Sequence, residues 1–313
     1  MTVRRLEEMS SFEIDRLDRE RTVVLLAVSP LEEHGPHLPV GVDAFTARHL
    51  AESVADRLVA ARPGWTALLA PTLHMGSFAF HAPGTVTMRQ RVVRDAVADY
   101  GDSLARAGFR FILLANGHGG PGHLVALDEA SAIVSRRRGV VMASLTGALA
   151  WHFLRSDLLS RVEAELGRPL TEGERAAATG DSHAGLWETS LMLWLRPELV
   201  DPAYRDLPPA RYSLPERLRP NYPLRGDGQG YRGAPALADP ALARAAAEVL
   251  LREVLRVVDD LLDGRARPGR ERSPFFHILP LRTNFWPAAA LALGGLAAWL
   301  WYRGRPPSRE ANP

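Results

Sequence analysis

The chain has 313 residues, 46% of them hydrophobic and 24% charged, an ordinary composition for a globular domain with a substantial core. It has no cysteine, and all 38 basic residues are arginine, so disulfides, thiolate metal sites and lysine-dependent covalent mechanisms are excluded. The formal net charge is +2, but residues after 264 carry eight arginines against two glutamates, so we expect no nucleic-acid binding by the preceding domain.

Apolar runs alternate with amphipathic stretches along most of the chain, a pattern typical of α/β proteins. It predicts strands at 22–29, 66–72, 109–115 and 140–146, and helices at 43–61, 89–107, 121–137, 184–195 and 240–263. This order favours a mainly parallel sheet with helices on both faces. We expect one domain over residues 1–264, in which the Pro-, Gly- and Arg-rich segment 201–239 forms a loop over a site or a subunit contact.

Metal-binding side chains follow the first predicted strand. Glu32 and His34 are two residues apart, so in an extended segment they point the same way, while Glu33 points away and is expected to be solvated. Asp43 opens the next helix, either as its N-cap or with its carboxylate free for a cation beyond the strand ends. Mixed carboxylate and imidazole ligands suit zinc, manganese or iron better than calcium.

Two later segments supply further ligands. The strand at 109–115 leads into Asn116-Gly-His118-Gly-Gly120, where glycines allow a loop to fold tightly around an ion or a substrate. The segment Asp181-Ser-His183-Ala-Gly-Leu-Trp-Glu188 places a histidine just before a helix and a glutamate near its start. Together these side chains are enough for a two-metal centre, which clamps a hydrolytic water and polarises a carbonyl.

These blocks, in this order, resemble those of the creatininase (creatinine amidohydrolase) family of metal-dependent amidohydrolases, and Pro83-Gly84-Thr85 matches a weaker fourth block. The resemblance runs from about residue 5 to about residue 260. It implies a creatininase-like fold, a homo-oligomer and two divalent metals per subunit, zinc or else manganese or iron. It also implies the ligands: Glu32, Asp43 and His118 for one metal, and His34, Asp43 and Glu188 for the other.

The resemblance further implies hydrolysis of a C–N amide bond by a metal-bound water, with His183 and Glu188 as catalytic residues. His183 would protonate the leaving nitrogen. Asn116 and the loop glycines, Gly119 and Gly120 among them, would orient the substrate or stabilise an oxyanion. Trp187 and His81 are further candidates for substrate contact.

Two departures from the family pattern bear on the substrate. In the branch of the family that acts on creatinine, the pattern that this chain otherwise resembles has a glutamate two residues after the loop histidine. This chain has Gly120 there. Leu186 and Trp187 also stand where some relatives have a further charged residue. The chain therefore looks closer to the branch with deformylases and the mycofactocin-system peptidase. The expected substrate is a small-molecule amide, or else a short peptide trimmed during cofactor maturation; the remaining alternative is a non-enzymatic, membrane-anchored metal-binding scaffold.

The end of the chain differs from the rest. Residues 265–283 have the composition of a linker, and Phe285 to Tyr302 is a run of 18 residues without a charge. As a helix this run would span roughly 27 Å, about the thickness of a bilayer core, with aromatic residues at both ends. We predict a transmembrane helix at 284–302, a basic tail at 303–313 and a single-pass cell-membrane protein with a cytoplasmic catalytic domain. The highly charged first 20 residues are unlike a signal peptide, and the alternative for the apolar helix is an oligomer interface.

Overall fold

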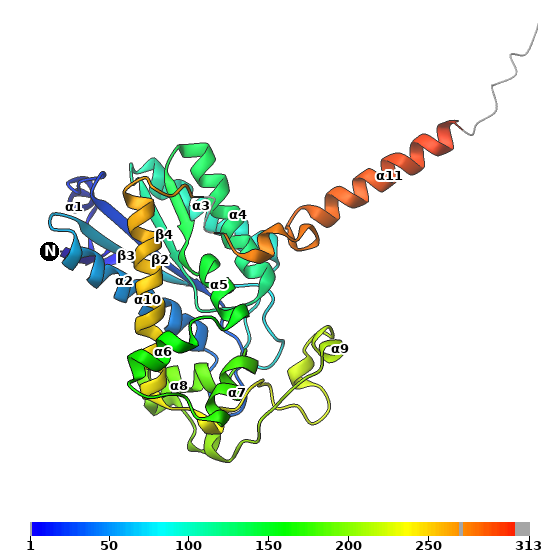
Figure 1. The fold of residues 1–313 in the computed structure, drawn as a ribbon. Coiled ribbons are helices and arrows are strands. Elements are labelled where there is room, and N and C mark those ends of the chain that lie inside the picture. The colour runs from blue at the N-terminus through cyan, green and yellow to red at the C-terminus, as the bar shows by residue number, and fades with distance from the viewer. Residues whose placement is uncertain (1, 269–271, 304–313) are drawn as a thin grey trace, which may run out of the picture.

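The computed structural model describes residues 2–268 and 272–303, the side chains of residues 148, 151, 153 and 154 excepted. A five-stranded parallel sheet lies at its centre, with the strand order β1-β3-β2-β4-β5 (Figure 1). The strands are β1 (Thr2–Arg5), β2 (Thr22–Ser29), β3 (Thr66–His74), β4 (Phe111–Ala115) and β5 (Val141–Ser144). The predicted parallel sheet is confirmed, and β1 is an edge strand that the apolar pattern did not predict.

Helices cover both faces of this sheet. On one face lie α2 (Val42–Ala61) and α10 (Pro240–Leu262), which pack on Val23 and Leu25 of β2. On the other lie α3 (Gln90–Arg106) and α4 (Pro121–Arg138), which pack on Val24 and Leu26. Every residue of β2 is buried, because successive side chains of the strand point into two different cores.

A smaller helical region extends from the end of β5. It contains α5 (Leu145–Arg155), α6 (Leu159–Leu166), α7 (Glu172–Gly180) and α8 (Leu186–Leu195). Residues of α6, α7 and α8 share an apolar cluster with the first half of α10. The strand predicted at 140–146 ends at Ser144, because α5 follows it without a turn.

Short elements complete the fold. Two brief α-helices are α1 (Ser11–Asp15) and α9 (Leu214–Arg217), the second inside the predicted 201–239 loop. The 3₁₀ turns are Leu6–Glu8, Pro197–Leu199, Pro202–Asp206, Tyr222–Leu224, Pro235–Leu237, Pro274–His277 and Leu279–Leu281.

The segment expected as a linker lies against the domain in its second half, which we call the strap (residues 272–284). Ser273 and Phe276 are buried, and the Phe276 ring lies between the guanidinium groups of Arg272 and Arg282, 4.2 and 3.8 Å from its centre. Arg282 also donates to Glu129 of α4 at 2.6 Å. The strap therefore fixes the start of the last helix on α4.

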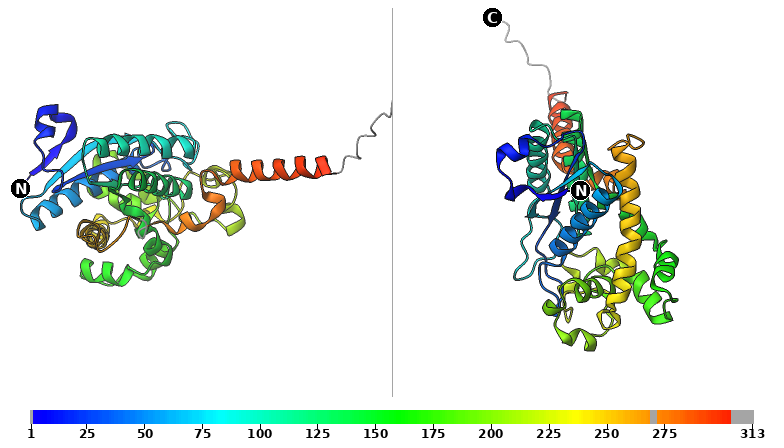
Figure 2. Two further views of the ribbon diagram at one scale, coloured as in Figure 1. Left: turned by 90° about the horizontal axis from the view of Figure 1, so that it is seen from above. Right: turned by 90° about the vertical axis from the view of Figure 1, so that its left-hand side faces the viewer.

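That last helix, α11 (Phe285–Arg303), projects away from the domain (Figure 2). By length and composition it can cross a membrane. Its mean hydropathy over 18 residues is 1.2, and none of these residues is buried. The basic tail predicted at 303–313 lies outside the described residues from 304 onward.

Candidate metal centre

The predicted ligands meet at the carboxyl edge of the sheet. Glu32 and His34 follow β2, Asp43 lies in the first turn of α2, and His118 follows β4. Glu188 reaches the same place from the first turn of α8. Parallel strands end at one edge, so the loops that follow β2 and β4 are neighbours there.

Two sets of three ligand atoms share one carboxylate. Nδ1 of His118 lies 2.9 Å from Oε2 of Glu32 and 3.1 Å from Oδ2 of Asp43. The other oxygen of Asp43 lies 3.5 Å from Nε2 of His34, which in turn lies 3.4 Å from Oε2 of Glu188. In each set the atoms lie within 4.8 Å of one another, close enough to hold one metal ion.

The two histidine rings are oriented from behind by backbone carbonyls. Nδ1 of His34 lies 3.0 Å from the carbonyl of Glu32, and Nε2 of His118 lies 3.2 Å from the carbonyl of Ser77. Because a carbonyl only accepts, each of these nitrogens carries a hydrogen, and in a neutral ring the opposite nitrogen presents a lone pair to the carboxylates. Acceptor atoms then face acceptor atoms, which is stable only with a positive charge between them.

Three of the facing atoms are buried without a hydrogen-bond partner among the described residues: Glu32 Oε2, His34 Nε2 and Asp43 Oδ2. Unpaired buried polar atoms are costly in a folded protein, and divalent cations satisfy such oxygen and imidazole donors. The donor set therefore fits a metal centre.

The electrostatic field points to the same need for positive charge. Burial would lower the pKa of His34, but the carboxylates of Glu188 and Asp43 outweigh burial and raise that pKa to about 10. For His118 too, Glu32 and Asp43 overcome burial and raise the pKa well above its ordinary value.

The loop after β4 is braced by Asn116. Its Oδ1 accepts from the His118 backbone N–H at 2.9 Å and from the Ser29 hydroxyl at 2.9 Å, and its Nδ2 donates to the His118 carbonyl at 2.7 Å. Oδ1 also lies 3.1 Å from Nε2 of the buried His123. The structure thus shows Asn116 holding the His118 backbone, whereas the sequence had suggested contact with substrate.

Two glycines let this loop approach the site closely. A Cβ at Gly117 would lie 2.3 Å from the Asp43 carbonyl oxygen, and one at Gly120 would lie 2.3 Å from Nε2 of His118. Gly119 is exposed and a Cβ there would meet nothing within 4 Å. We call the exposed surface at Gly119, next to the buried His118, the mouth of the candidate site.

His183 lies beside the cluster, and its partner is a residue that the sequence reading misplaced. Its ring centre is 4.4 Å from that of His34, and its Nε2 lies 2.8 Å from the Glu33 carbonyl and 3.3 Å from Glu33 Oε1. Glu33 is buried, so the expectation of a solvated carboxylate is wrong. Gly230 of another segment covers it: a Cβ there would lie 2.2 Å from Glu33 Oε2.

Burial and the neighbouring His34 lower the pKa of His183, but the Glu33 contact and the carboxylates of Glu32 and Glu188 leave it raised overall. His183 also belongs to a third group, with Glu32 and His34, whose ligand atoms lie within 4.8 Å of one another. The same ring is therefore placed either to exchange a proton or to complete a ligand set.

The start of α8 is held by side-chain hydrogen bonds. Asp181 accepts from the N–H groups of Leu186 and Trp187, both at 2.9 Å, and its burial raises its pKa to about 7. The Ala184 N–H donates to Glu188 Oε2 at 2.5 Å. Ala184 is buried and has a φ of +49°, in the left-handed region that favours glycine.

The remaining predicted residues lie farther from the cluster. The indole N–H of Trp187 donates to the Ala178 carbonyl at 3.2 Å, and its ring packs on the apolar cluster of α6, α7 and α10. His81 is exposed, and its N–H donates to Asn221 Oδ1 at 3.0 Å. The structure does not bring Trp187 to the ligands and places His81 in the outer rim.

Sequence reasoning missed the loop after β3. The Phe80 N–H donates to Glu32 Oε1 at 2.5 Å, and the Phe80 ring lies edge-on to His183 with centres 4.8 Å apart. With Ser77, whose carbonyl faces His118, this loop contacts two of the predicted ligands, Glu32 and His118, and the ring of His183. Its position at the end of a parallel strand was the available signal.

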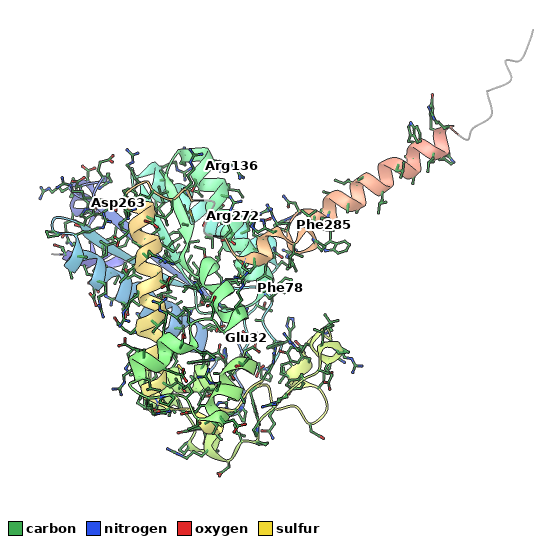
Figure 3. The ribbon with its side chains drawn as sticks, in the orientation of Figure 1. Glu32, Phe78, Arg136, Asp263, Arg272 and Phe285 are labelled. Carbon is green, nitrogen blue, oxygen red and sulfur yellow. The ribbon has the colours of Figure 1, made fainter. Side chains whose placement is uncertain are left out.

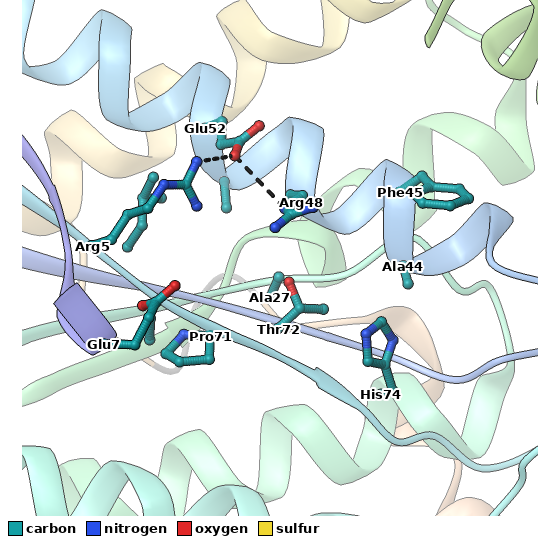
Figure 4. Close-up of a pocket in the computed structure, with 13 residues that line it drawn as sticks. Arg5, Glu7, Ala27, Ala44, Phe45, Arg48, Glu52, Pro71, Thr72 and His74 are labelled. Carbon is teal, nitrogen blue, oxygen red and sulfur yellow. Dashed lines mark hydrogen bonds and ion pairs between the residues drawn. The ribbon is translucent and has the colours of Figure 1, made fainter. Parts of the chain in front are cut away.

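A separate cavity of about 270 Å³ lies between α2 and the strands β1 and β3 (Figure 4). Three of its charged side chains are paired: Glu52 lies 2.8 Å from Arg5 and 3.8 Å from Arg48. None of the predicted ligands lines it, so it is distinct from the metal centre.

Comparison with known proteins agrees with this geometry. A family model described as creatininase, creatinine amidohydrolase, matches residues 7–258. The chain is 31% identical over 183 residues to the mycofactocin precursor peptide peptidase of Mycobacterium ulcerans, covering 56% of this chain and 60% of that protein. It is 29% identical over 220 residues to the creatinine amidohydrolase of Pseudomonas putida, covering 66% and 77%. The match with the peptidase thus spans less than two thirds of the relative's length.

Solved structures of creatininase share the fold. One with manganese superposes with a TM-score of 0.61 and a mutant of the zinc–zinc type with 0.59, each at 23% identity over 82% of this chain and 97% of the other.

Proposed function

Because this chain belongs to the creatininase family, we propose that it is a metal-dependent amidohydrolase that cleaves a C–N bond in a small amide or a short peptide. The observation that carries the proposal is the pair of ligand sets joined by Asp43. Glu32, Asp43 and His118 would hold one divalent cation, and His34, Asp43 and Glu188 the other. The relatives' names, and solved creatininases with manganese or zinc, support this assignment.

Bound cations at such a centre polarise the substrate carbonyl and lower the pKa of water. The protein's own part is to hold the ligands in register. The carbonyls of Glu32 and Ser77 orient the two imidazoles, and the Phe80 N–H fixes the second oxygen of Glu32.

We assign the proton transfer to His183. In hydrolysis, the oxygen of water bonds to the carbonyl carbon and the C–N bond breaks. The nitrogen leaves as an amine with one of the two protons of water, and the other proton is released to solvent as the acid product ionises to a carboxylate. Glu33 fixes one ring nitrogen of His183, so the ring is oriented and the other nitrogen is left to deliver that proton. Glu188 serves as a ligand and, through the Ala184 N–H, ties that ligand to the residue next to His183.

A specific observation favours a peptide or an open-chain amide over creatinine. The sequence pattern of creatinine-hydrolysing enzymes has a glutamate at the position where this chain has Gly120. In this chain a side chain at position 120 would collide with His118. The mouth beside Gly119 is open, as an extended substrate requires. Among the activities considered, the general amidohydrolase proposal therefore ranks first, hydrolysis of a short peptide second and hydrolysis of creatinine last.

The test combines metal analysis with a substrate panel. The purified protein is stripped with a chelator, reloaded with Zn²⁺, Mn²⁺ or Fe²⁺, and assayed against creatinine, formamides and peptide anilides. We expect two cations per chain and metal-dependent hydrolysis, both lost in His118→Ala and kept in His74→Ala, an exposed histidine at the end of β3. Full activity in His118→Ala would overturn the proposal, and stoichiometric metal without any hydrolysis would favour the scaffold alternative.

We further propose that α11 anchors the protein in the cell membrane as a single span, with the catalytic domain in the cytoplasm. Its 19 residues, its aromatic ends and its fully exposed surface support this. A homo-oligomer, which the family resemblance implies, is testable by light scattering in detergent.

A further inference from the structure

One exposed part of the chain is both apolar and basic. Residues 211–225, which we call the basic lobe, contain four arginines and one glutamate. Leu214 and Leu218 lie one turn apart on it with 66% and 79% of their surface exposed. Isolated exposed leucines are ordinary, but two adjacent ones among arginines are typical of surfaces that rest on anionic bilayers.

The basic lobe contacts the loop after β3, which lies beside the candidate metal centre. The Tyr222 ring lies edge-on to the Phe80 ring, with centres 5.3 Å apart, and Asn221 accepts from the His81 N–H at 3.0 Å. Phe80 in turn contacts His183 and Glu32. The lobe therefore lies directly over the loop that supports the ligands.

The base of α11 is attached to the other end of that same loop, where α3 begins. Gln90 donates to the Leu281 carbonyl at 2.9 Å, and Arg94 donates to Asn284 at 3.0 Å. In Figure 3, Phe78 lies between Glu32 and Phe285. Figures 1 and 2 show α11 and the segment with α9 at the end of the molecule opposite the N-terminus.

We propose that the basic lobe is a second membrane contact, so that the metal centre opens at the bilayer surface and takes amides attached to a lipid chain. This rests on the proposed amidohydrolase activity and on the anchoring role of α11. The strap, held on α4 by Arg282, stops α11 from swinging freely, so the anchor brings the mouth and the lobe to the membrane together.

The bilayer is a better occupant for this surface than a second copy of the chain. Ile278 and Leu279, 46% and 62% exposed, lie in the strap beside the base of α11. They extend the exposed apolar surface of the span along the strap, in continuity with a helix that has no buried residue. The arginines of the lobe match the negative headgroups of a cytoplasmic leaflet.

The absence of cysteine allows a clean depth measurement. Full-length Leu218→Cys, Phe12→Cys and Leu293→Cys are each labelled with an environment-sensitive fluorophore and reconstituted into phosphatidylcholine–phosphatidylglycerol vesicles that contain headgroup nitroxide lipid. Phe12 is the matched control, because it is 80% exposed and lies in α1, near the N-terminal end of the molecule. We expect quenching at residues 218 and 293 and none at residue 12.

Quenching at 293 but not at 218 would overturn the second contact while leaving the anchor in place. No quenching at 293 would overturn both. A shift of the 218 label that follows protein concentration and ignores lipid would assign the surface to self-association and overturn the membrane contact.

A kinetic comparison tests the substrate class. Peptide anilides with and without an N-terminal palmitoyl chain are assayed in the same vesicles, where confinement to the surface raises the kcat/KM for the acylated one by roughly tenfold or more. The double variant Leu214→Ser/Leu218→Ser should lose that preference and keep its rate on the soluble anilide. Equal preference in parent and double variant overturns the proposal, whereas no hydrolysis of either anilide, with label 218 still quenched, counts against the amidase function alone.

Discussion

Oδ2 of Asp43 lies 3.1 Å from Nδ1 of His118, and both atoms are turned into the same buried space. The other oxygen of Asp43 faces His34. One carboxylate thus faces two imidazoles that belong to different candidate ligand sets, so both of the proposed cation positions would depend on it.

We therefore expect Asp43→Asn to lose binding at both positions, whereas Glu188→Gln loses only one. The drop in affinity should exceed the roughly 10- to 100-fold that changes to outer hydrogen-bond partners cost. Equilibrium dialysis with elemental analysis measures it. Asp56→Asn, an exposed aspartate on the same helix, is the control. Two cations retained by Asp43→Asn would rule out the shared-ligand arrangement.

Variants at two neighbouring glycines, Gly119 and Gly120, can tell a need for close packing against His118 from a need for loop flexibility. Gly120→Ala places a Cβ 2.3 Å from Nε2 of His118, so it should push the ring off the Ser77 carbonyl and weaken cation binding at least about tenfold. Gly119→Ala meets nothing within 4 Å and should bind as the parent does. Equal affinities for the two variants, measured by competition with a chromogenic chelator, would contradict this reading.

The buried Asp128 on α4 gives a pH prediction remote from the metal ligands. Burial raises the pKa of this carboxyl from 3.8 to about 7, while its Oδ2 accepts from the Ser273 N–H at 2.9 Å. Because the folded state binds this proton more tightly than the unfolded chain, the stabilisation is complete below about pH 4 and declines as the pH rises toward 7.

Asp128→Asn keeps an oxygen acceptor for Ser273 but cannot ionise. The variant should gain stability relative to the parent across that window, by at most about 4 kcal/mol. Urea unfolding of the full chain at several pH values measures the difference. Parallel stability curves from pH 4 to 8 would show that Asp128 titrates normally.

The strap should loosen when its central ring is changed. Phe276→Leu keeps an apolar side chain but removes the stacking of Arg272 and Arg282, a loss of about 1 kcal/mol. Faster proteolysis between residues 265 and 284 is the expected result. The adjacent, half-buried Phe275→Leu provides the comparison. Equal cleavage rates would mean that the stacking does not hold the strap.

Removal of α11 should change solubility and leave the metal centre intact. A chain ending at Thr283 keeps the Arg282–Glu129 contact, so we expect it to stay in solution without detergent and to bind the same amount of metal. A full-length Leu293→Arg/Leu296→Arg variant controls for length, because charges at the middle of a span oppose insertion. Membrane sedimentation of the truncated chain that persists when Leu214→Ser and Leu218→Ser are added would refute the anchor.

Much of the fold was readable from the sequence because β2, α2, α3 and α4 carry strong apolar patterns. β2 begins and ends at the predicted residues, and the ligands at 32, 34, 43, 118 and 188 converge as the strand ends require. β1 was missed since four residues with two arginines give no apolar run. α5 was missed because it follows β5 without a breaking residue.

The wrong prediction of a solvated Glu33 has a physical cause. Alternation along a strand gives the direction of a side chain, but it does not tell which distant segment covers it. Glu33 lies beside His183, and the distant chain near Gly230 buries it. Asn116 and Trp187 each donate to a backbone carbonyl, a contact that no local pattern predicted, and their contact with substrate stays a prediction.

Ala184, the residue directly after His183, has a backbone angle that an L-amino acid adopts at a cost of about 1 kcal/mol. Ala184→Gly should give a more stable protein, because glycine adopts this backbone angle without that cost. The added backbone freedom would also make the distance between His183 and Glu188 less well defined, because the Ala184 N–H now restrains the Glu188 carboxylate. Selection for stability should therefore favour glycine at position 184, whereas selection for catalytic turnover should favour alanine.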